Sequence, residues 1–91
     1  MKVNVRIPTA FREQAEGVSE VNVSASTVQN AIDELIRLFP AIGELIRGPD
    51  GTMRKTIGVY LNKEDVRFLE GAASMVSEGD EVMLLPPASG G

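Results

Sequence analysis

The 91-residue chain contains no cysteine and no histidine. Without cysteine it has no disulfide framework, no iron–sulfur cluster and no thiolate nucleophile. Without histidine it lacks the commonest general base and the commonest metal ligand, which excludes Ser–His and Cys–His catalysis. A zinc site would need carboxylates alone. We therefore expect no metal site in this chain and no catalytic activity of its own.

Long hydrophobic runs and an excess of positive charge are also missing. No apolar run approaches the ~20 residues of a membrane-spanning helix, and the first seven residues alternate in polarity, so no signal peptide is expected. With 13 acidic and 9 basic residues the net charge is −4, which disfavours nucleic-acid binding. We expect a cytoplasmic protein that contacts neither membrane nor nucleic acid and that attracts a basic surface on a partner.

Apolar and polar residues alternate in four segments, a pattern typical of strands with one buried face. These segments are residues 3–7, 21–23, 57–61 and 81–85, and residues 66–68 form a fifth, shorter candidate. The first two are expected to pair as a hairpin, joined by the polar connection of residues 9–17. Pro86 and Pro87 end the last strand because proline cannot continue a hydrogen-bonded ladder.

One amphipathic helix is expected over residues 27–39. Its apolar residues fall at helical spacing, and Pro40 stops it. Ser26 and Gln29 match the ends of a capping box, with Ser26 as N-cap. Residues 41–47 fit either a turn or a second short helix, and residues 69–79 fit a loop containing a helical turn.

The order of the elements predicts the fold class. A hairpin, a crossover helix and further strands give an α+β fold, here a β-grasp (ubiquitin-like) domain with a mixed sheet of four to five strands covered by one main helix. We expect this domain to span residues 1–87. Residues 88–91 form a flexible tail that ends in Gly90 and Gly91.

The small-residue tail follows directly on a strand and a Pro-Pro stop. Two terminal glycines also fit a frayed end, but in this position they would project from the end of the sheet. A carboxylate is a poor electrophile, and a carboxyl terminus must be activated as an acyl-adenylate before sulfur attacks it. Glycine has no side chain to obstruct the narrow approach to an activating enzyme. Ala88, Ser89 and Gly90 would then thread that channel, and Gly91 would carry the reacting carboxylate.

Several segments together resemble the ThiS/MoaD family of ubiquitin-like sulfur carriers. The resemblance covers essentially the whole chain and is most similar to the carrier of the actinobacterial cysteine pathway. The segments that carry it are residues 1–8, Val59-Tyr60-Leu61-Asn62, Gly79-Asp80-Glu81-Val82, Leu85-Pro86-Pro87 and Gly90-Gly91, with Ile7-Pro8-Thr9, Arg12, Asn62 and residues 64–68 closest to the cysteine carrier.

The resemblance implies a cycle and a set of partners. A ubiquitin-activating-type enzyme adenylates Gly91 with ATP and, after sulfur delivery, leaves a C-terminal thiocarboxylate. A cysteine synthase with pyridoxal phosphate then takes the sulfur, and a metalloprotease releases cysteine and regenerates the carrier. ATP and pyridoxal phosphate belong to the partners in this account, and the chain itself binds no cofactor.

Strand register predicts a docking patch for these partner enzymes. If Val82 and Leu84 face the helix, Met83 and Leu85 face outward. Tyr60 then faces outward on the neighbouring strand, and Phe68 extends the patch. A contiguous exposed apolar group is typical of an interaction surface. An inverted register would reverse every assignment.

Two alternatives to a cysteine-pathway carrier stay open. The first is the small subunit of molybdopterin synthase, which donates sulfur from the same terminus to a large synthase subunit. The second is a ubiquitin-like modifier or interaction module, in which Gly91 is joined to lysine amines or is not activated. The acceptor pathway, the sulfur source and the oligomeric state are not specified by the sequence.

Overall fold

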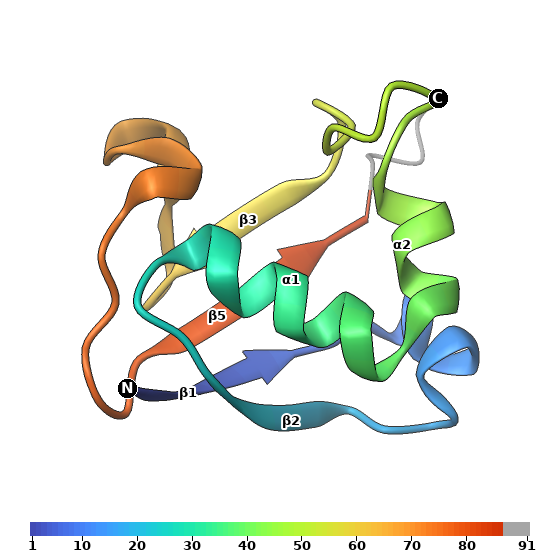
Figure 1. Ribbon diagram of the computed structural model, residues 1–91, viewed down its shortest axis with the longest axis horizontal. Coiled ribbons are helices and arrows are strands. Elements are labelled where there is room, and N and C mark those ends of the chain that lie inside the picture. The colour runs from blue at the N-terminus through green and yellow to red at the C-terminus, as the bar shows by residue number, and fades with distance from the viewer. Residues whose placement is uncertain (87–91) are drawn as a thin grey trace.

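The structure, a computed structural model, describes residues 1–86 and contains one five-stranded mixed sheet. Its strand order is β2-β1-β5-β3-β4 (Figure 1). The central pair β1 and β5 is parallel, and the other pairs are antiparallel. The strands are β1 (Lys2–Arg6), β2 (Glu20–Ser24), β3 (Gly58–Leu61), β4 (Glu64–Asp65) and β5 (Glu81–Leu85). The predicted α+β, β-grasp class with a mixed sheet is confirmed.

Two α-helices lie on one face of this sheet (Figure 1). The longer helix α1 (Val28–Leu38) crosses the sheet, and α2 (Pro40–Ile46) follows it after one residue. Pro40 ends the first helix and opens the second, because proline fits the first position of a helix, where no N–H bond is needed. Of the two options for residues 41–47, the helix is the one that forms.

The N-terminus of α1 differs from the prediction by one residue. The N-cap is Thr27, whose hydroxyl oxygen accepts a hydrogen bond from the Asn30 N–H at 3.1 Å. The predicted cap at Ser26 with Gln29 reaching back is wrong. Ser26 donates its hydroxyl hydrogen to the Asn30 side-chain oxygen at 2.7 Å, and Gln29 donates to Asp33 at 2.9 Å. Neighbouring Ser and Thr both satisfy the cap preference, and the extended backbone of Thr27 places its hydroxyl over the first turn.

Three 3-10 helices complete the described chain: η1 (Thr9–Ala15), η2 (Val66–Phe68) and η3 (Gly71–Ala73). The expected strand at residues 66–68 is therefore wrong, and the short fourth strand is β4. The reason is local, because the Asp65 carboxylate accepts a hydrogen bond from the Arg67 N–H at 2.9 Å and so caps a turn. The expected connection at residues 9–17 contains η1, where Arg12 donates from Nε to the Ile7 carbonyl oxygen at 3.0 Å.

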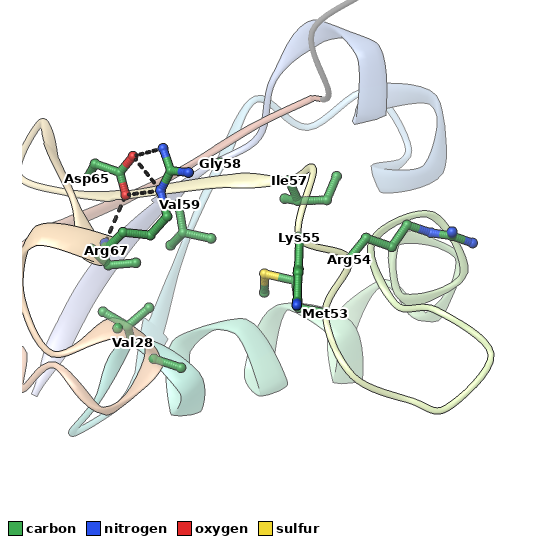
Figure 2. Close-up of a pocket in the computed structure, with 12 residues that line it drawn as sticks. Val28, Met53, Arg54, Lys55, Ile57, Gly58, Val59, Asp65 and Arg67 are labelled. Carbon is green, nitrogen blue, oxygen red and sulfur yellow. Dashed lines mark hydrogen bonds and ion pairs between the residues drawn. The ribbon is translucent and has the colours of Figure 1, made fainter. Parts of the chain in front are cut away.

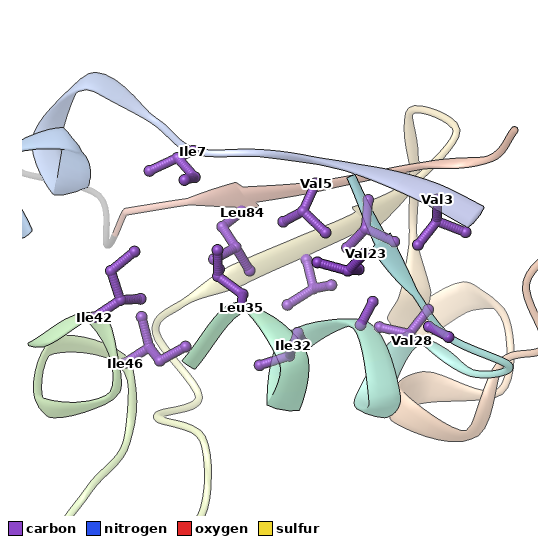
Figure 3. Close-up of a cluster of buried hydrophobic side chains, with 14 of the residues drawn as sticks. Val3, Val5, Ile7, Val23, Val28, Ile32, Leu35, Ile42, Ile46 and Leu84 are labelled. Carbon is purple, nitrogen blue, oxygen red and sulfur yellow. The ribbon is translucent and has the colours of Figure 1, made fainter. Parts of the chain in front are cut away.

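The core lies between the sheet and the helices (Figure 3). Alternate residues of each strand enter it, so Val82 and Leu84 are fully buried while Glu81, Met83 and Leu85 are partly exposed. The largest fully buried side chains are Ile7, Ile32, Leu35, Ile42, Ile46 and Leu84. None of the helices within residues 1–86 is both long and apolar enough to cross a membrane.

Candidate functional site

The face of the sheet opposite the helices carries an apolar strip, defined as Tyr60, Met83 and Leu85. Tyr60 of β3 lies directly opposite Met83 of β5, and Leu85 is the next residue of β5 on the same face. All three side chains are half-buried, whereas their strand neighbours Val82 and Leu84 are completely buried. The register assumed in the sequence-based prediction is therefore the one that the sheet adopts, and the strip leads along β5 toward Pro86.

Gly58 shapes the strip at its Leu85 end. It pairs with Leu85, and a Cβ atom built on Gly58 would lie 3.3 Å from the Leu85 Cβ and 3.4 Å from Cε1 of Tyr60. Glycine thus leaves the space that the tyrosine ring occupies beside Leu85. The Tyr60 ring, on the same strand, and the cross-strand Leu85 side chain therefore both approach the bare backbone of Gly58 closely.

Charged side chains border the strip on both sides. On the β1 side, Arg6 lies 3.6 Å from Glu81 and 3.9 Å from Glu20. On the β4 side, Arg67 forms a bidentate ion pair with Asp65, with a shortest distance of 2.7 Å. Asp65 is the cross-strand partner of Tyr60, so this pair sits beside the tyrosine ring. An apolar centre with a charged rim is the usual arrangement of a protein-binding surface.

The ion pair at the rim also shifts two pKa values. Hydrogen bonds from the Arg67 side chain, and then from its backbone N–H, hold the pKa of Asp65 below its ordinary value. The side-chain hydrogen bonds to Asp65, followed by the charge of Asp65, raise the pKa of Arg67. Both groups stay charged at neutral pH, so the strip keeps a fixed ionic neighbour on this side.

A polar network at the start of β5 was missed by the sequence analysis, which named Asn62 only among the residues that carry the family resemblance. Asn62 and Lys63 have positive φ values of 50° and 71°, as a tight hairpin between β3 and β4 requires. The Asn62 side chain donates to Asp80 at 3.1 Å and accepts from the Glu81 N–H at 2.9 Å. Asp80 in turn accepts from the Ser77 N–H at 2.7 Å. The network fixes the residue at which β5 begins. Two residues of the apolar strip, Met83 and Leu85, lie further along that strand.

The remaining predicted site residues fall in two groups. Phe68 lies in η2, outside the sheet, and its side chain is 80% exposed. The structure does not place it in register with the strip, and its role there stays a prediction. Ala88, Ser89, Gly90 and Gly91 lie outside the described residues. Among residues 1–86 no cluster of three or more potential metal ligands is present.

Comparison with known proteins agrees with this architecture. The ThiS family model matches residues 5–91. The sulfur carrier protein CysO of Mycobacterium tuberculosis is 36% identical over 93 residues, covering 100% of both chains. Among solved structures, small archaeal modifier protein 1 of Haloferax volcanii has a TM-score of 0.88 at 30% identity, covering 100% of both chains.

A second solved structure is a complex, that of BexX with CysO from Amycolatopsis orientalis. It matches with a TM-score of 0.86 at 34% identity, covering 98% of this chain and 99% of that chain. These likenesses extend over the whole β-grasp domain and are not confined to one motif. The resemblance inferred from the sequence is confirmed, and the chain belongs to the ThiS family.

Proposed function

We propose that this protein is a sulfur carrier that works through the carboxylate of Gly91 and supplies sulfur for cysteine biosynthesis. The observation that carries the proposal is the position of β5. This strand is paired on both sides, by β1 and β3, and presents Met83 and Leu85 on the open face. Only five residues separate Leu85 from Gly91. A partner that binds the strip therefore binds the strand whose sequence leads directly to the C-terminus.

The proposed chemistry replaces one oxygen of Gly91 with sulfur. A carboxylate oxygen attacks the α-phosphorus of ATP, and pyrophosphate leaves, which gives an acyl-adenylate. A sulfide or persulfide sulfur then attacks the carbonyl carbon and displaces AMP, which leaves a thiocarboxylate. If the donor is a persulfide, this attack gives an acyl disulfide. A thiol of the activating enzyme then attacks the donor's sulfur, which releases the thiocarboxylate and forms an enzyme disulfide that a dithiol reductant opens. The nucleotide, the sulfur donor and any pyridoxal phosphate are held by partner enzymes, so the carrier needs no acid, base or metal.

Similarity to sulfur carriers supports the choice of reaction. The CysO proteins of Mycobacterium tuberculosis and Amycolatopsis orientalis are named as sulfur carrier and as part of a complex, respectively. The acceptor that we propose is a cysteine synthase, as the resemblance to the cysteine-pathway carrier implies. The metalloprotease that the resemblance implies would then release the product and regenerate Gly91.

The test uses the need for a free terminal carboxylate on Gly91. The native chain and a variant with one alanine added after Gly91 are each incubated with ATP, sulfide and the activating enzyme, and pyrophosphate release is measured. We expect release with the native chain and none above background with the extended chain. Equal release from the two chains would contradict the proposal, and equal circular dichroism spectra would show that both are folded.

A second function is favoured by one comparison, the likeness to small archaeal modifier protein 1. In a modifier, the activated Gly91 is joined to a lysine amine of a target protein instead of receiving sulfur. Both functions need the free terminus, so the extended variant does not separate them. They are separated by the product, because only the carrier passes sulfur to a purified acceptor such as cysteine synthase or the large subunit of molybdopterin synthase.

A further inference from the structure

The outer edge of β3 is only partly covered by another strand. β4 pairs with Tyr60 and Leu61 alone, while β5 pairs with all four residues of β3. Asn62 donates its N–H to the Glu81 carbonyl at 2.8 Å, so residues 58, 60 and 62 form their backbone bonds toward β5. By the same alternation, Val59 and Leu61 direct their N–H groups to the outer edge. Leu61 meets Glu64 there, but no strand lies beside Val59.

The segment that would have continued β4 past Val59 turns away. The Val66 carbonyl, which an extended β4 would offer to the Val59 N–H, accepts the Leu69 N–H at 2.9 Å within η2. No turn, loop or helix of residues 1–86 accepts a hydrogen bond from the Val59 N–H. A short stretch of sheet edge therefore has no strand partner, although the Val59 residue as a whole is only 6% exposed. An unpaired edge is the template for an added strand.

A groove of about 370 Å³ lies along this open edge. Its apolar wall is formed by Val28, Met53, Ile57, Val59 and Val66, which come from α1, the loop before β3, β3 itself and η2. Figure 2 shows the Asp65–Arg67 pair at one end of the groove and Arg54 at the other. Ala72 of η3 also lines it and is exposed. The groove lies between the sheet edge and α1, and it shares Gly58, Asp65 and Arg67 with the border of the open-face strip.

The charge at the rim is positive although the whole chain carries a net charge of −4. Arg54 and Lys55 are both exposed, and within residues 1–86 neither forms an ion pair. Arg67 closes the other end, with Asp65 as its partner. Carboxylates on a bound segment would complement Arg54 and Lys55, the two cations without an ion-pair partner. Its apolar side chains would fit the apolar wall of the groove.

We propose that this groove binds an extended acidic and apolar segment of a partner protein, which adds to β3 as a further strand. A backbone carbonyl of the segment accepts the Val59 N–H, and alternate apolar side chains enter the groove. Asp or Glu side chains beside them meet Arg54 and Lys55. Strand addition derives its affinity from main-chain bonds and its specificity from the side-chain pockets. The apolar wall of the groove does not include Met83 or Leu85, so this binding site and the open-face strip can be tested separately.

The test is an NMR titration of the full ¹⁵N-labelled chain with the blocked peptide Asp-Asp-Val-Thr-Val-Asp-Asp. Acidic residues at both ends allow either strand direction. We expect saturable shifts centred on the amides of Val59, Lys55 and Arg54. The peptide Lys-Lys-Val-Thr-Val-Lys-Lys is the charge control. Its affinity should be lower than that of the acidic peptide by about tenfold or more. Equal binding of the two peptides, shifts centred on Met83 and Leu85, or no saturable shift would each overturn the proposal.

Two variants of η3 provide a matched steric control. Ala72→Trp places a large ring in the groove, while Ala73→Trp adds the same ring at an exposed position outside it. We expect Ala72→Trp to weaken peptide binding about tenfold or more and Ala73→Trp to leave it unchanged. Equal effects of the two variants would overturn the assignment of the groove. Shifts at Val59 that depend on protein concentration without peptide would identify a second copy as the occupant, against the proposal.

Discussion

The two faces of the sheet are formed by the same strands, but one face is buried under the helices and the other is partly exposed. On the helix side, Val5, Val82 and Leu84 are completely buried in the apolar core. On the open side, the same strands present Arg6, Met83 and other half-exposed or charged residues. The covered face stabilises the fold, and the open face is left to interact with other molecules. A substitution should therefore reduce stability on one face and partner binding on the other.

The largest effect on stability is expected from a change on the covered side. Leu35 lies in α1 with no exposed surface, and Leu35→Ala would leave a cavity between the helix and the sheet. We expect the free energy of unfolding to fall by about 2–5 kcal/mol, measured by urea denaturation. A loss below about 1 kcal/mol would contradict the placement of Leu35 in a tightly packed core.

The second prediction concerns the apolar strip on the open side. Met83→Asp together with Leu85→Asp should leave the chain folded but weaken binding to the activating enzyme by about 30-fold, as expected for central residues of an interface. The matched control is Asn22→Asp with Ser24→Asp, which adds the same charge to exposed positions of β2. Unchanged binding of the strip variant in a folded protein would remove the docking role.

The third prediction separates two adjacent cap candidates. Thr27→Ala removes the hydroxyl oxygen that accepts the Asn30 N–H, and should cost about 1 kcal/mol of the free energy of unfolding. Ser26→Ala removes only a bond from one exposed side chain to another, and should cost less than about 0.5 kcal/mol. Thermal or urea unfolding of the pair measures the difference, and the reverse order would restore Ser26 as the cap.

The smallest effect is expected from Asp65, at the boundary between the strip and β4. Because Arg67 holds the folded-state pKa of Asp65 below its ordinary value, the stabilisation is present above about pH 4 and is lost as pH falls through the folded-state pKa. Asp65→Asn should therefore be less stable than the native chain at pH 7 and equal to it at strongly acid pH. A stability difference that does not change with pH would contradict the ion pair.

The strands were predictable because each carries its own periodic pattern, with Val3 and Val5 or Val82 and Leu84 separated by polar or half-exposed residues. The same alternation identified Tyr60, Met83 and Leu85 as outward-facing. Local competition was harder to predict. Ser26 and Thr27 have the same cap preference, and only the backbone geometry decides between them.

Features that depend on one side-chain bond or on distant segments carried no such signal. Val66 and Phe68 have strand-like composition, but the bond from the Arg67 N–H to the Asp65 carboxylate turns the chain into η2. That turn is also what leaves Val59 without a strand partner on its outer side. The groove arises only where the loop before β3, η2 and η3 come together, and the Asn62–Asp80 contact joins residues 18 apart in sequence. Neither has a period or a motif in the chain itself.

The most direct measurement is an intact-mass spectrum of the native chain after incubation with ATP, the activating enzyme and a sulfur donor. We expect a gain that matches the replacement of one oxygen by sulfur, mapped to Gly91 by fragmentation and absent from a chain that lacks Gly91. The contradictory result is an unchanged mass in the presence of an activating enzyme that thiocarboxylates a known carrier under the same conditions. That result would leave the modifier or interaction module as the function of this β-grasp domain.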